Sequence, residues 1–314
     1  MGVEQLHLFP ELDEQIRNVS YLVSQSDKEQ LDQFFTKPYV ATLCWDSLCP
    51  ILLKLTGKNI KDLCYIEPSV GDGVFFDLLP HGQRIGIDID PRRNEFLGAD
   101  FLLLNPSLFT FERSDTVIVG NPPFGKRGKM AVAFFNKASQ IADTIAFILP
   151  VIFRKYFIHK MLPGNWRWIY STSLPRQAFW TEKKGDFEVN TEFQIWTRLS
   201  STHENLRLFN PPPLQHNDFE FWQYNNTIQA LSVFENDFDF AVPSQGWQDY
   251  SRREIHSDKC EKTKQWMLFK PCNDAVYDRL HDDIDYEELA FKSATSIPGF
   301  RKGDLVQEYM YRYE

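Results

Sequence analysis

The sequence has no long hydrophobic run: none reaches the ~20 residues that a membrane-spanning helix requires. Its first thirteen residues carry three acidic side chains and lack the basic cluster and apolar stretch of a secretory signal. The five cysteines are an odd number without a C-x-x-C pair. We therefore expect free thiols, a reducing cytoplasmic location and no membrane partner.

Metal-ligand spacings are also missing, because the seven histidines form no H-x-x-x-H or H-E-x-x-H pattern; we predict no metal site. Positive charge is in deficit, with 34 Lys and Arg against 43 Asp and Glu and a net charge of −9. Most of the excess acid lies in residues 201–314, which hold 12 basic and 20 acidic residues. This excludes a protein that coats nucleic acid through bulk charge, but it allows a local basic face.

Four short apolar runs, each followed by loop residues, predict buried strands. They cover residues 63–66, 84–88, 116–119 and 144–149. Helical spacing at about 27–58 and at 130–141 predicts helices before and between them, and the alternating stretch 189–196 predicts a late antiparallel strand. Strands alternating with helices predict an α/β fold with a mostly parallel, doubly wound sheet.

The segment Asn210-Pro-Pro-Pro213 predicts a domain boundary, because three prolines fit neither a helix nor a central strand. A chain of 314 residues is long enough for two ordinary domains. We assign residues 1–204 to the first domain. Residues 205–314 form a smaller α+β unit that we expect to recognise the substrate or target.

The loop after the first predicted strand reads Glu67-Pro-Ser-Val-Gly-Asp-Gly-Val-Phe75. Gly71 and Gly73 permit a tight turn and a close backbone approach to a ligand at the carboxyl end of a strand. The loop lacks the G-K-S/T of a phosphate loop, and Glu67 and Asp72 would repel phosphate. Acidic groups at this place favour a cationic or hydroxyl-rich ligand.

The next two loops carry residues that suit an adenosine. Asp88, at the end of the second strand, can accept both hydroxyls of a ribose, and Ile89 can pack on an adenine face. In the following loop, Asp100 can accept from an adenine amino group and Phe101 can stack on the ring. Each of these features is common by itself, and their order along the chain is more informative.

The sharpest signal is Gly120-Asn-Pro-Pro-Phe-Gly125, directly after an apolar strand. Pro122 and Pro123 remove two N–H donors, which leaves carbonyl oxygens and the Asn121 amide as acceptors for a planar amino group. Phe124 adds a π-face. Methylation of an aromatic or amide –NH₂ needs these groups, because accepting both N–H protons stabilises the positive charge that develops on nitrogen. The second Asn-Pro-Pro, at residue 210, lacks both the strand and the aromatic.

Taken in order, Glu67-Pro-Ser-x-Gly-x-Gly-x-Phe, Gly86-Ile-Asp88, Ala99-Asp-Phe101 and Asn121-Pro-Pro-Phe124 resemble the amino-methyltransferases that modify DNA bases with S-adenosylmethionine. Phe35-Thr-Lys-Pro-x-Val-Ala41 resembles the cofactor-binding element of that family. With this element first and an extra domain last, the chain resembles the gamma arrangement of adenine-specific DNA methyltransferases over about residues 30–200. The resemblance implies a Rossmann-like methyltransferase fold.

The resemblance also implies roles for individual residues. S-adenosylmethionine would be the cofactor, held by Thr36, Pro38, Glu67, Gly71, Asp72 and Gly73 at its methionine end and by Asp88, Ile89, Asp100 and Phe101 at its adenosine end. The catalytic loop would be Asn121, Pro122, Pro123 and Phe124, with Phe124 replacing the tyrosine that is frequent in the family. The substrate would be a specific duplex DNA site whose adenine is flipped out and methylated at N6, as in restriction-modification.

Substrate-binding residues are expected beside the catalytic loop. Lys126, Arg127 and Lys129 follow it directly and could bind phosphates. A second aromatic stacking on the flipped base is implied by the resemblance, and either Trp180 or Phe187 could supply it. The target sequence and any protein partner are not predicted.

Three other interpretations stay open. The acidic residues 201–314 leave an RNA adenine N6-methyltransferase as the main alternative, since RNA can be recognised by shape and stacking. A protein glutamine methyltransferase would use the same pocket, and a non-catalytic methyltransferase-fold subunit would use the tail for docking. A cytosine ring-carbon methyltransferase is excluded because Pro271-Cys272 comes after all the cofactor motifs and without their strand context.

Overall fold

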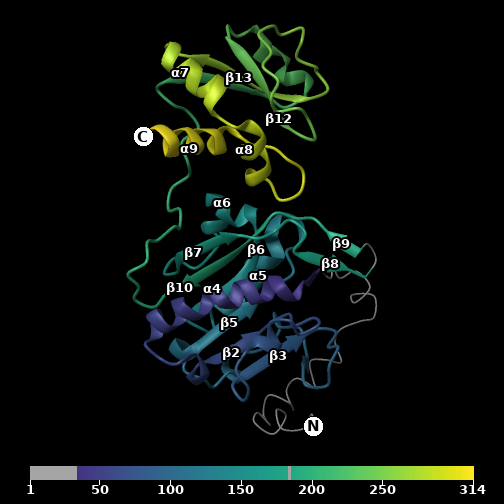
Figure 1. Ribbon diagram of the computed structural model, residues 1–314, viewed down its shortest axis with the longest axis vertical. Helices are drawn as coiled ribbons and strands as arrows, with labels where there is room; N and C mark the ends of the chain where they lie inside the picture. The colour runs from purple at the N-terminus through teal and green to yellow at the C-terminus, as the bar shows by residue number, and fades with distance from the viewer. Residues whose placement is uncertain (1–33, 183–184) are drawn as a thin grey trace. The chain divides into compact units, whose positions relative to one another are not determined.

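The computed structural model describes residues 34–182 and 185–314 (Figure 1). The chain divides into two compact units, Met1–Phe209 and Asn210–Glu314. Residues 205–209, which the sequence analysis placed in the second unit, therefore lie with the first. The part of the predicted helical segment that precedes residue 34 is outside the described residues. No helix within the described ranges is long and apolar enough to cross a membrane.

The first unit contains a seven-stranded sheet with the strand order β4-β3-β2-β5-β6-β10-β7. Strands β4, β3, β2, β5 and β6 run parallel, whereas β10 is antiparallel to both of its neighbours. This confirms the predicted Rossmann-like sheet with a late antiparallel strand. The strands are β2 (Cys64–Glu67), β3 (Arg84–Asp88), β4 (Leu97–Gly98), β5 (Thr116–Gly120), β6 (Thr144–Pro150), β7 (Arg167–Ser173) and β10 (Thr191–Thr197).

Two long helices cover opposite faces of this sheet. Helix α4 (Pro38–Thr56) packs its buried residues on Val117 and Val119 of β5, and helix α5 (Lys129–Ala138) packs on Ile118 of the same strand. The alternation follows from the two-residue period of a strand, which sends neighbouring side chains to opposite faces. Shorter helices lie in the connections: η1 (Ile60–Asp62), η2 (Phe76–Leu78), η3 (Pro106–Leu108), η4 (Arg113–Asp115), η5 (Lys126–Gly128), η6 (Val151–Arg154) and α6 (Tyr156–His159).

A small antiparallel sheet lies beside the large one. It consists of β1 (Phe35–Thr36), β8 (Phe179–Thr181) and β9 (Gly185–Phe187). Phe35 pairs with Trp180, and Thr36 pairs with Phe179. This pairing holds the Phe-Thr-Lys-Pro segment against the hairpin that connects β7 to β10 (Figure 1).

The second unit contains a three-stranded antiparallel sheet in the order β11-β13-β12. Helices pack on it around a separate hydrophobic core that includes Phe269, Tyr286 and Tyr309. This confirms a smaller α+β unit. Its elements are β11 (Phe219–Tyr224), η7 (Ile228–Glu235), β12 (Phe240–Gln245), β13 (Gln265–Pro271), α7 (Asp274–Asp278), η8 (Arg279–Asp283), α8 (Tyr286–Ser293) and α9 (Lys302–Tyr313).

Arg207 anchors the end of the first unit. Its guanidinium is buried and donates to four backbone carbonyls at the end of α6 and in the segment after it, those of His159, Leu162, Pro163 and Trp166. Buried backbone carbonyls cannot accept hydrogen bonds from solvent, so they need a donor from the protein, and Arg207 supplies it. The arrangement explains why the chain stays with the first unit up to residue 209.

We expect Arg207→Ala to lower the free energy of unfolding by about 3–5 kcal/mol, because several buried carbonyls lose a charged donor at once. Urea unfolding measures this change. Arg167→Ala is the matched control: Arg167 donates to only two carbonyls, those of Ser201 and His203, at a part-buried position. A loss for Arg207→Ala no larger than that for the control would contradict the anchoring role.

Candidate active site

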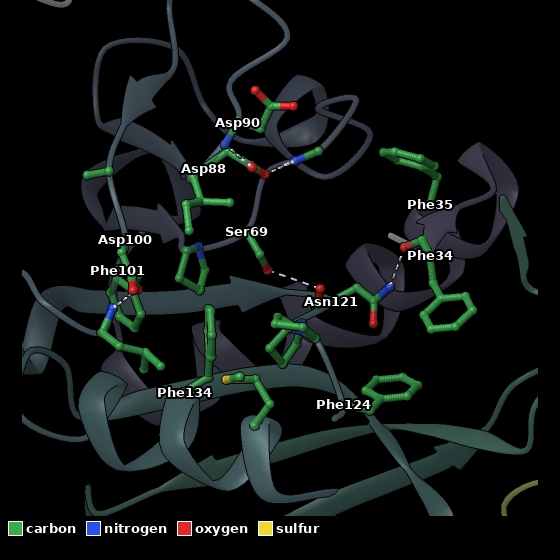
Figure 2. Close-up of a pocket in the computed structure, with 18 of the residues that line it drawn as sticks. Phe34, Phe35, Ser69, Asp88, Asp90, Asp100, Phe101, Asn121, Phe124 and Phe134 are labelled. Atoms are coloured by element: carbon green, nitrogen blue, oxygen red, sulfur yellow. Dashed lines mark hydrogen bonds between the residues drawn. The ribbon is translucent and has the colours of Figure 1, made fainter. Parts of the chain in front are cut away.

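A cavity of about 200 Å³ opens at the carboxyl ends of β2, β3 and β5 (Figure 2). Loops after these strands line it, together with the start of β1 and one side of α5. The lining residues are Phe34, Phe35, Pro68, Ser69, Gly71, Asp88, Ile89, Asp90, Arg92, Ala99, Asp100, Phe101, Leu102, Asn121, Pro122, Pro123, Phe124, Met130 and Phe134. Ligands of open parallel sheets bind at this edge, as the sequence analysis assumed.

The Asn121 side chain is held in one orientation in this cavity. Its amide Nδ2 donates to the carbonyl of Phe34 at 3.2 Å, and its own backbone carbonyl accepts from Ser69 Oγ at 3.0 Å. Asn121 Oδ1 is buried and has no hydrogen-bond partner. A buried acceptor without a donor is costly, so this oxygen is suited to an N–H group that arrives with a ligand (Figure 2).

The backbone around Asn121 is anchored at both ends. Gly120 has φ +148°, and a Cβ there would lie 3.1 Å from Glu67 Cγ. The Phe124 carbonyl accepts from the N–H groups of Met130 and Ala131 at 3.1 and 3.3 Å, which ties the loop to the first turn of α5. The Phe124 ring meets Phe179 edge-on, with 6.3 Å between centroids. The loop is therefore preorganised before any ligand binds.

Glu67 is the last residue of β2 and is only 2% exposed. Its Oε2 has no hydrogen-bond partner, and burial raises the pKa of this carboxyl well above its usual range. A second cavity of about 30 Å³ lies against it and is also lined by Thr36, Gly71 and Asp72. A buried carboxyl group with one oxygen left unpartnered beside a cavity fits a cationic ligand group.

Asp88 links two of the loops that line the larger cavity. Its Oδ2 accepts from the N–H of Gly71 at 2.8 Å, and its Oδ1 accepts from the N–H of Asp90 at 2.9 Å. Burial raises the pKa of this carboxyl, and the two backbone donors oppose the rise. Gly71 makes the turn at φ +51°, a region that glycine adopts without strain.

The third loop places Asp100 and Phe101 on the cavity wall. Asp100 Oδ1 accepts from the N–H of Leu102 at 2.9 Å. The Phe101 ring is 1% exposed and lies 5.5 Å from the ring of Phe134 on α5. This part of the cavity combines a flat apolar surface with a carboxylate at its edge.

Most of the predicted site residues come together at these two cavities. The larger one is lined by Gly71, Asp88, Ile89, Asp100, Phe101, Asn121, Pro122, Pro123 and Phe124, and the smaller one by Thr36, Glu67, Gly71 and Asp72. Gly73 lies behind the wall against Phe96 and Arg93, and Pro38 is the first residue of α4. Trp180 and Phe187 line neither cavity: their rings pack on Phe35 at 4.8 Å and on Phe34 at 4.6 Å.

Sequence reasoning missed several lining residues. Arg92 lies over the Phe35 ring at 4.1 Å and forms ion pairs with Asp72 at 3.0 Å and Glu182 at 2.7 Å. Phe34 and Phe35 reach the cavity through the pairing of β1 with β8. Phe35 could have been found from the Phe-Thr-Lys-Pro segment that it begins, whereas no sequence signal distinguishes Phe34.

Exposed cations flank the Asn121–Phe124 loop. Lys126, Arg127 and Lys129 are exposed, and η5 packs against η6, since a Cβ on Gly128 would lie 3.2 Å from Ile152 Cγ2. Arg154, at the end of η6, forms an ion pair with the fully buried Glu192 of β10. We call the three exposed cations Lys126, Arg127 and Lys129 the basic rim.

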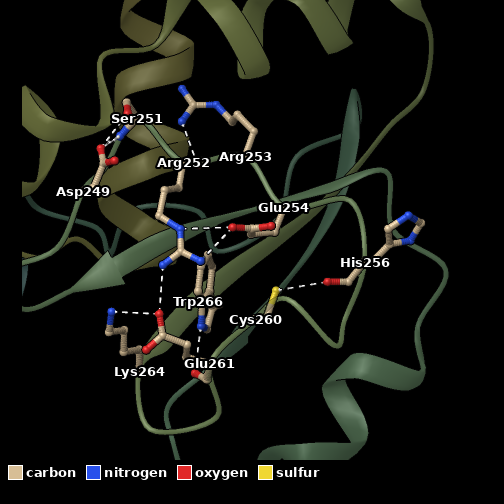
Figure 3. A network of polar contacts seen from close by, with 10 residues as sticks. All are labelled: Asp249, Ser251, Arg252, Arg253, Glu254, His256, Cys260, Glu261, Lys264 and Trp266. Carbon is tan, nitrogen blue, oxygen red and sulfur yellow. Dashed lines mark hydrogen bonds and ion pairs between the residues drawn. The ribbon is translucent and has the colours of Figure 1, made fainter.

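Two adjacent arginines of the second unit, Arg252 and Arg253, make their contacts within that unit. Arg252 pairs with Glu254 at 2.7 Å and with Glu261 at 3.0 Å (Figure 3). Arg253 donates to the carbonyls of Tyr250 and His281. The guanidinium groups of both arginines are therefore engaged within the unit. In the part of the chain that the structure describes, no group of three or more His, Cys, Asp or Glu side chains is placed to hold a metal ion.

No protein-family model matches the sequence, and no curated protein matches it. Among solved structures, a candidate RNA methyltransferase from Pyrococcus horikoshii is 15% identical, with a TM-score of 0.40, covering 60% of this chain and 97% of its own. The 23S rRNA methyltransferase ErmE is 17% identical, with a TM-score of 0.36, over 55% of this chain and 71% of its own. The type IIG restriction endonuclease BpuSI is 11% identical, with a TM-score of 0.39, over 89% of this chain and 36% of its own. Likenesses this low do not assign a function, which has to be inferred from the residues of the cavity.

Proposed function

We propose that this protein is an S-adenosylmethionine-dependent methyltransferase that acts on an exocyclic amino nitrogen of a nucleic-acid base, with adenine N6 in DNA as the specific target. The observation that carries the proposal is the unpartnered Oδ1 of Asn121, which is held in place by Phe34 and buried at the carboxyl end of β5. The resemblance of the ordered motifs to gamma-type adenine methyltransferases supports adenine and DNA.

The residues present fit the proposed cofactor. S-adenosylmethionine carries a cationic ammonium group, a ribose diol and an adenine ring, and it supplies an electrophilic methyl group when bound. Glu67 Oε2 lacks a hydrogen-bond partner, and the Glu67 carboxyl would hold the ammonium group. Asp88 would accept from the ribose hydroxyls, while Ile89, Asp100 and Phe101 line the cavity that would take the adenine.

The catalytic loop would act on the target nitrogen. The lone pair of an aromatic amine is delocalised, so the nitrogen is a poor nucleophile. Asn121 Oδ1 and the Pro122 carbonyl would accept its two N–H protons, which stabilises the charge that develops on nitrogen during attack. Phe124 would hold the base by stacking, and alignment in the cavity would supply the positional part of the rate. No base has to remove a proton before attack.

The basic rim supports a nucleic-acid substrate rather than a protein side chain. Its cations lie beside the catalytic loop, where the phosphates next to an extruded base would pass. Extruding a base from a duplex costs a few kcal/mol. Contacts with the phosphates, together with stacking of the base, offset this cost. A glutamine side chain would need neither.

Transfer of tritiated methyl from S-adenosylmethionine to separate pools of duplex DNA, total RNA and protein tests the proposal. Nucleoside mass spectrometry then identifies the labelled position. We expect label in DNA as N6-methyladenine. Label confined to RNA would replace DNA by RNA as the substrate, and label confined to protein glutamine would overturn a nucleic-acid function.

We expect Asp88→Ala to weaken cofactor affinity by about 10- to 100-fold, because a charged acceptor for the ribose and the tie to Gly71 are both lost. Calorimetric titration with S-adenosylhomocysteine measures this affinity. Asp46→Ala is the control, since Asp46 is exposed on α4 and lines neither cavity. An affinity within twofold of the wild type would refute the ribose assignment.

A further inference from the structure

The Asn121 amide has an aromatic neighbour that the sequence motifs did not indicate. Phe34 accepts the Asn121 Nδ2 proton with its backbone carbonyl, and its side chain also lines the cavity. Figure 2 shows the Phe34 and Phe124 rings beside the Asn121 amide. Both rings are half-buried, so each keeps a surface that a ligand can contact.

Each of these two rings is supported from behind by another aromatic. The Phe187 ring lies 4.6 Å from that of Phe34, at an interplanar angle of 37°. The Phe179 ring lies 6.3 Å from that of Phe124, at 87°. Phe179 belongs to the hydrophobic cluster between α4 and the large sheet, and the other three rings pack on that cluster. Rings held in this way lose little freedom when a flat group inserts beside them.

We propose that Phe34 is the second aromatic wall of the target subsite, opposite Phe124, and that Phe187 acts only as the support behind it. The inference rests on the proposed function, because it concerns the group whose N–H protons Asn121 accepts. Trp180, the other residue considered for this role, packs on Phe35 and lines neither cavity.

The Phe34 and Phe124 rings have no hydrogen-bonding group, so they favour a ligand group that is flat and can stack. A nucleobase can stack on both of them, and stacking of one base on an aromatic side chain changes affinity by about tenfold or more. The primary amide of a glutamine has no ring to stack and gains nothing from the second wall. The subsite therefore favours a heteroaromatic amine, which names the substrate class of this site.

Phe34→Leu tests this role, because leucine keeps an apolar side chain of similar reach but has no flat face. The Phe34 carbonyl remains, so the hold on Asn121 is retained. With saturating S-adenosylmethionine, we expect the KM for the methylated nucleic-acid pool to rise about tenfold. Phe34→Tyr should restore KM to within about twofold, because a ring is enough for stacking; a role in packing alone would be satisfied by leucine and would show no such rescue.

Tyr170→Leu is the matched control, since Tyr170 also packs on this cluster and lines neither cavity. It should change KM by less than about threefold. Wild-type KM in Phe34→Leu together with a tenfold rise in Phe187→Leu or Trp180→Leu would overturn the inference while leaving the proposed function intact. Methylation of protein alone by the wild type would instead overturn the proposed function itself.

Discussion

Asn121→Ala is expected to reduce methyl transfer by at least about 100- to 1,000-fold, the effect of removing one preorganised group that stabilises developing charge. The variant loses the buried Oδ1 that would accept an N–H proton of the target nitrogen. Cofactor affinity should stay within a few fold, since Glu67, Asp88 and Asp100 are untouched. The expected signature is therefore a fall in kcat with little change in cofactor binding.

The chain provides a matched control for this substitution. Asn210 also precedes a pair of prolines, but it is exposed and lies outside both cavities. Asn210→Ala should retain wild-type activity. Single-turnover methyl transfer measures the chemical step in both variants, and calorimetry with S-adenosylhomocysteine measures cofactor binding. Near-full activity in Asn121→Ala would remove the basis of the catalytic assignment.

Glu67→Gln is expected to weaken cofactor affinity by about 10- to 100-fold at pH 8, because the amide cannot form the ion pair with the ammonium group. The wild-type affinity should also rise with pH. Burial raises the pKa of Glu67, so the carboxyl becomes ionised only when the pH passes through that raised value. In Glu67→Gln this pH dependence should vanish. A pH-independent affinity in the wild type would contradict an ionised Glu67 in the complex.

The same group makes the stability of the free protein depend on pH. The folded state binds the Glu67 proton more tightly than the unfolded state, so the free energy of unfolding falls as the pH rises from the usual glutamate pKa to the raised one. The slope cannot exceed about 1.4 kcal/mol per pH unit for one proton. Urea unfolding of the two proteins between pH 5 and pH 8 should show Glu67→Gln gaining stability relative to the wild type. If the difference in free energy of unfolding between the two proteins stayed constant from pH 5 to pH 8, the Glu67 carboxyl would not be the source of the pH dependence.

The sequence alone determined the parts of this protein that depend on local patterns. Short apolar runs that end in Gly, Pro or Asn correctly predicted the parallel strands β2, β3, β5 and β6. Because the carboxyl ends of parallel strands meet at one edge of a sheet, the loops after them could be expected to share a site. The Asn121 and Asp88 loops do line one cavity.

Only the tertiary structure decided which distant segments complete that site. β1 has two residues and no pattern of its own, and its pairing with β8 joins residues more than 140 positions apart. That pairing brings Phe34 and Phe35 to the cavity and leaves Trp180 and Phe187 behind them. The sequence pattern also did not predict the ion pairs of Arg252 with Glu254 and Glu261. Residue type and spacing describe what a side chain can do, but its neighbours depend on long-range packing, which a local pattern does not contain.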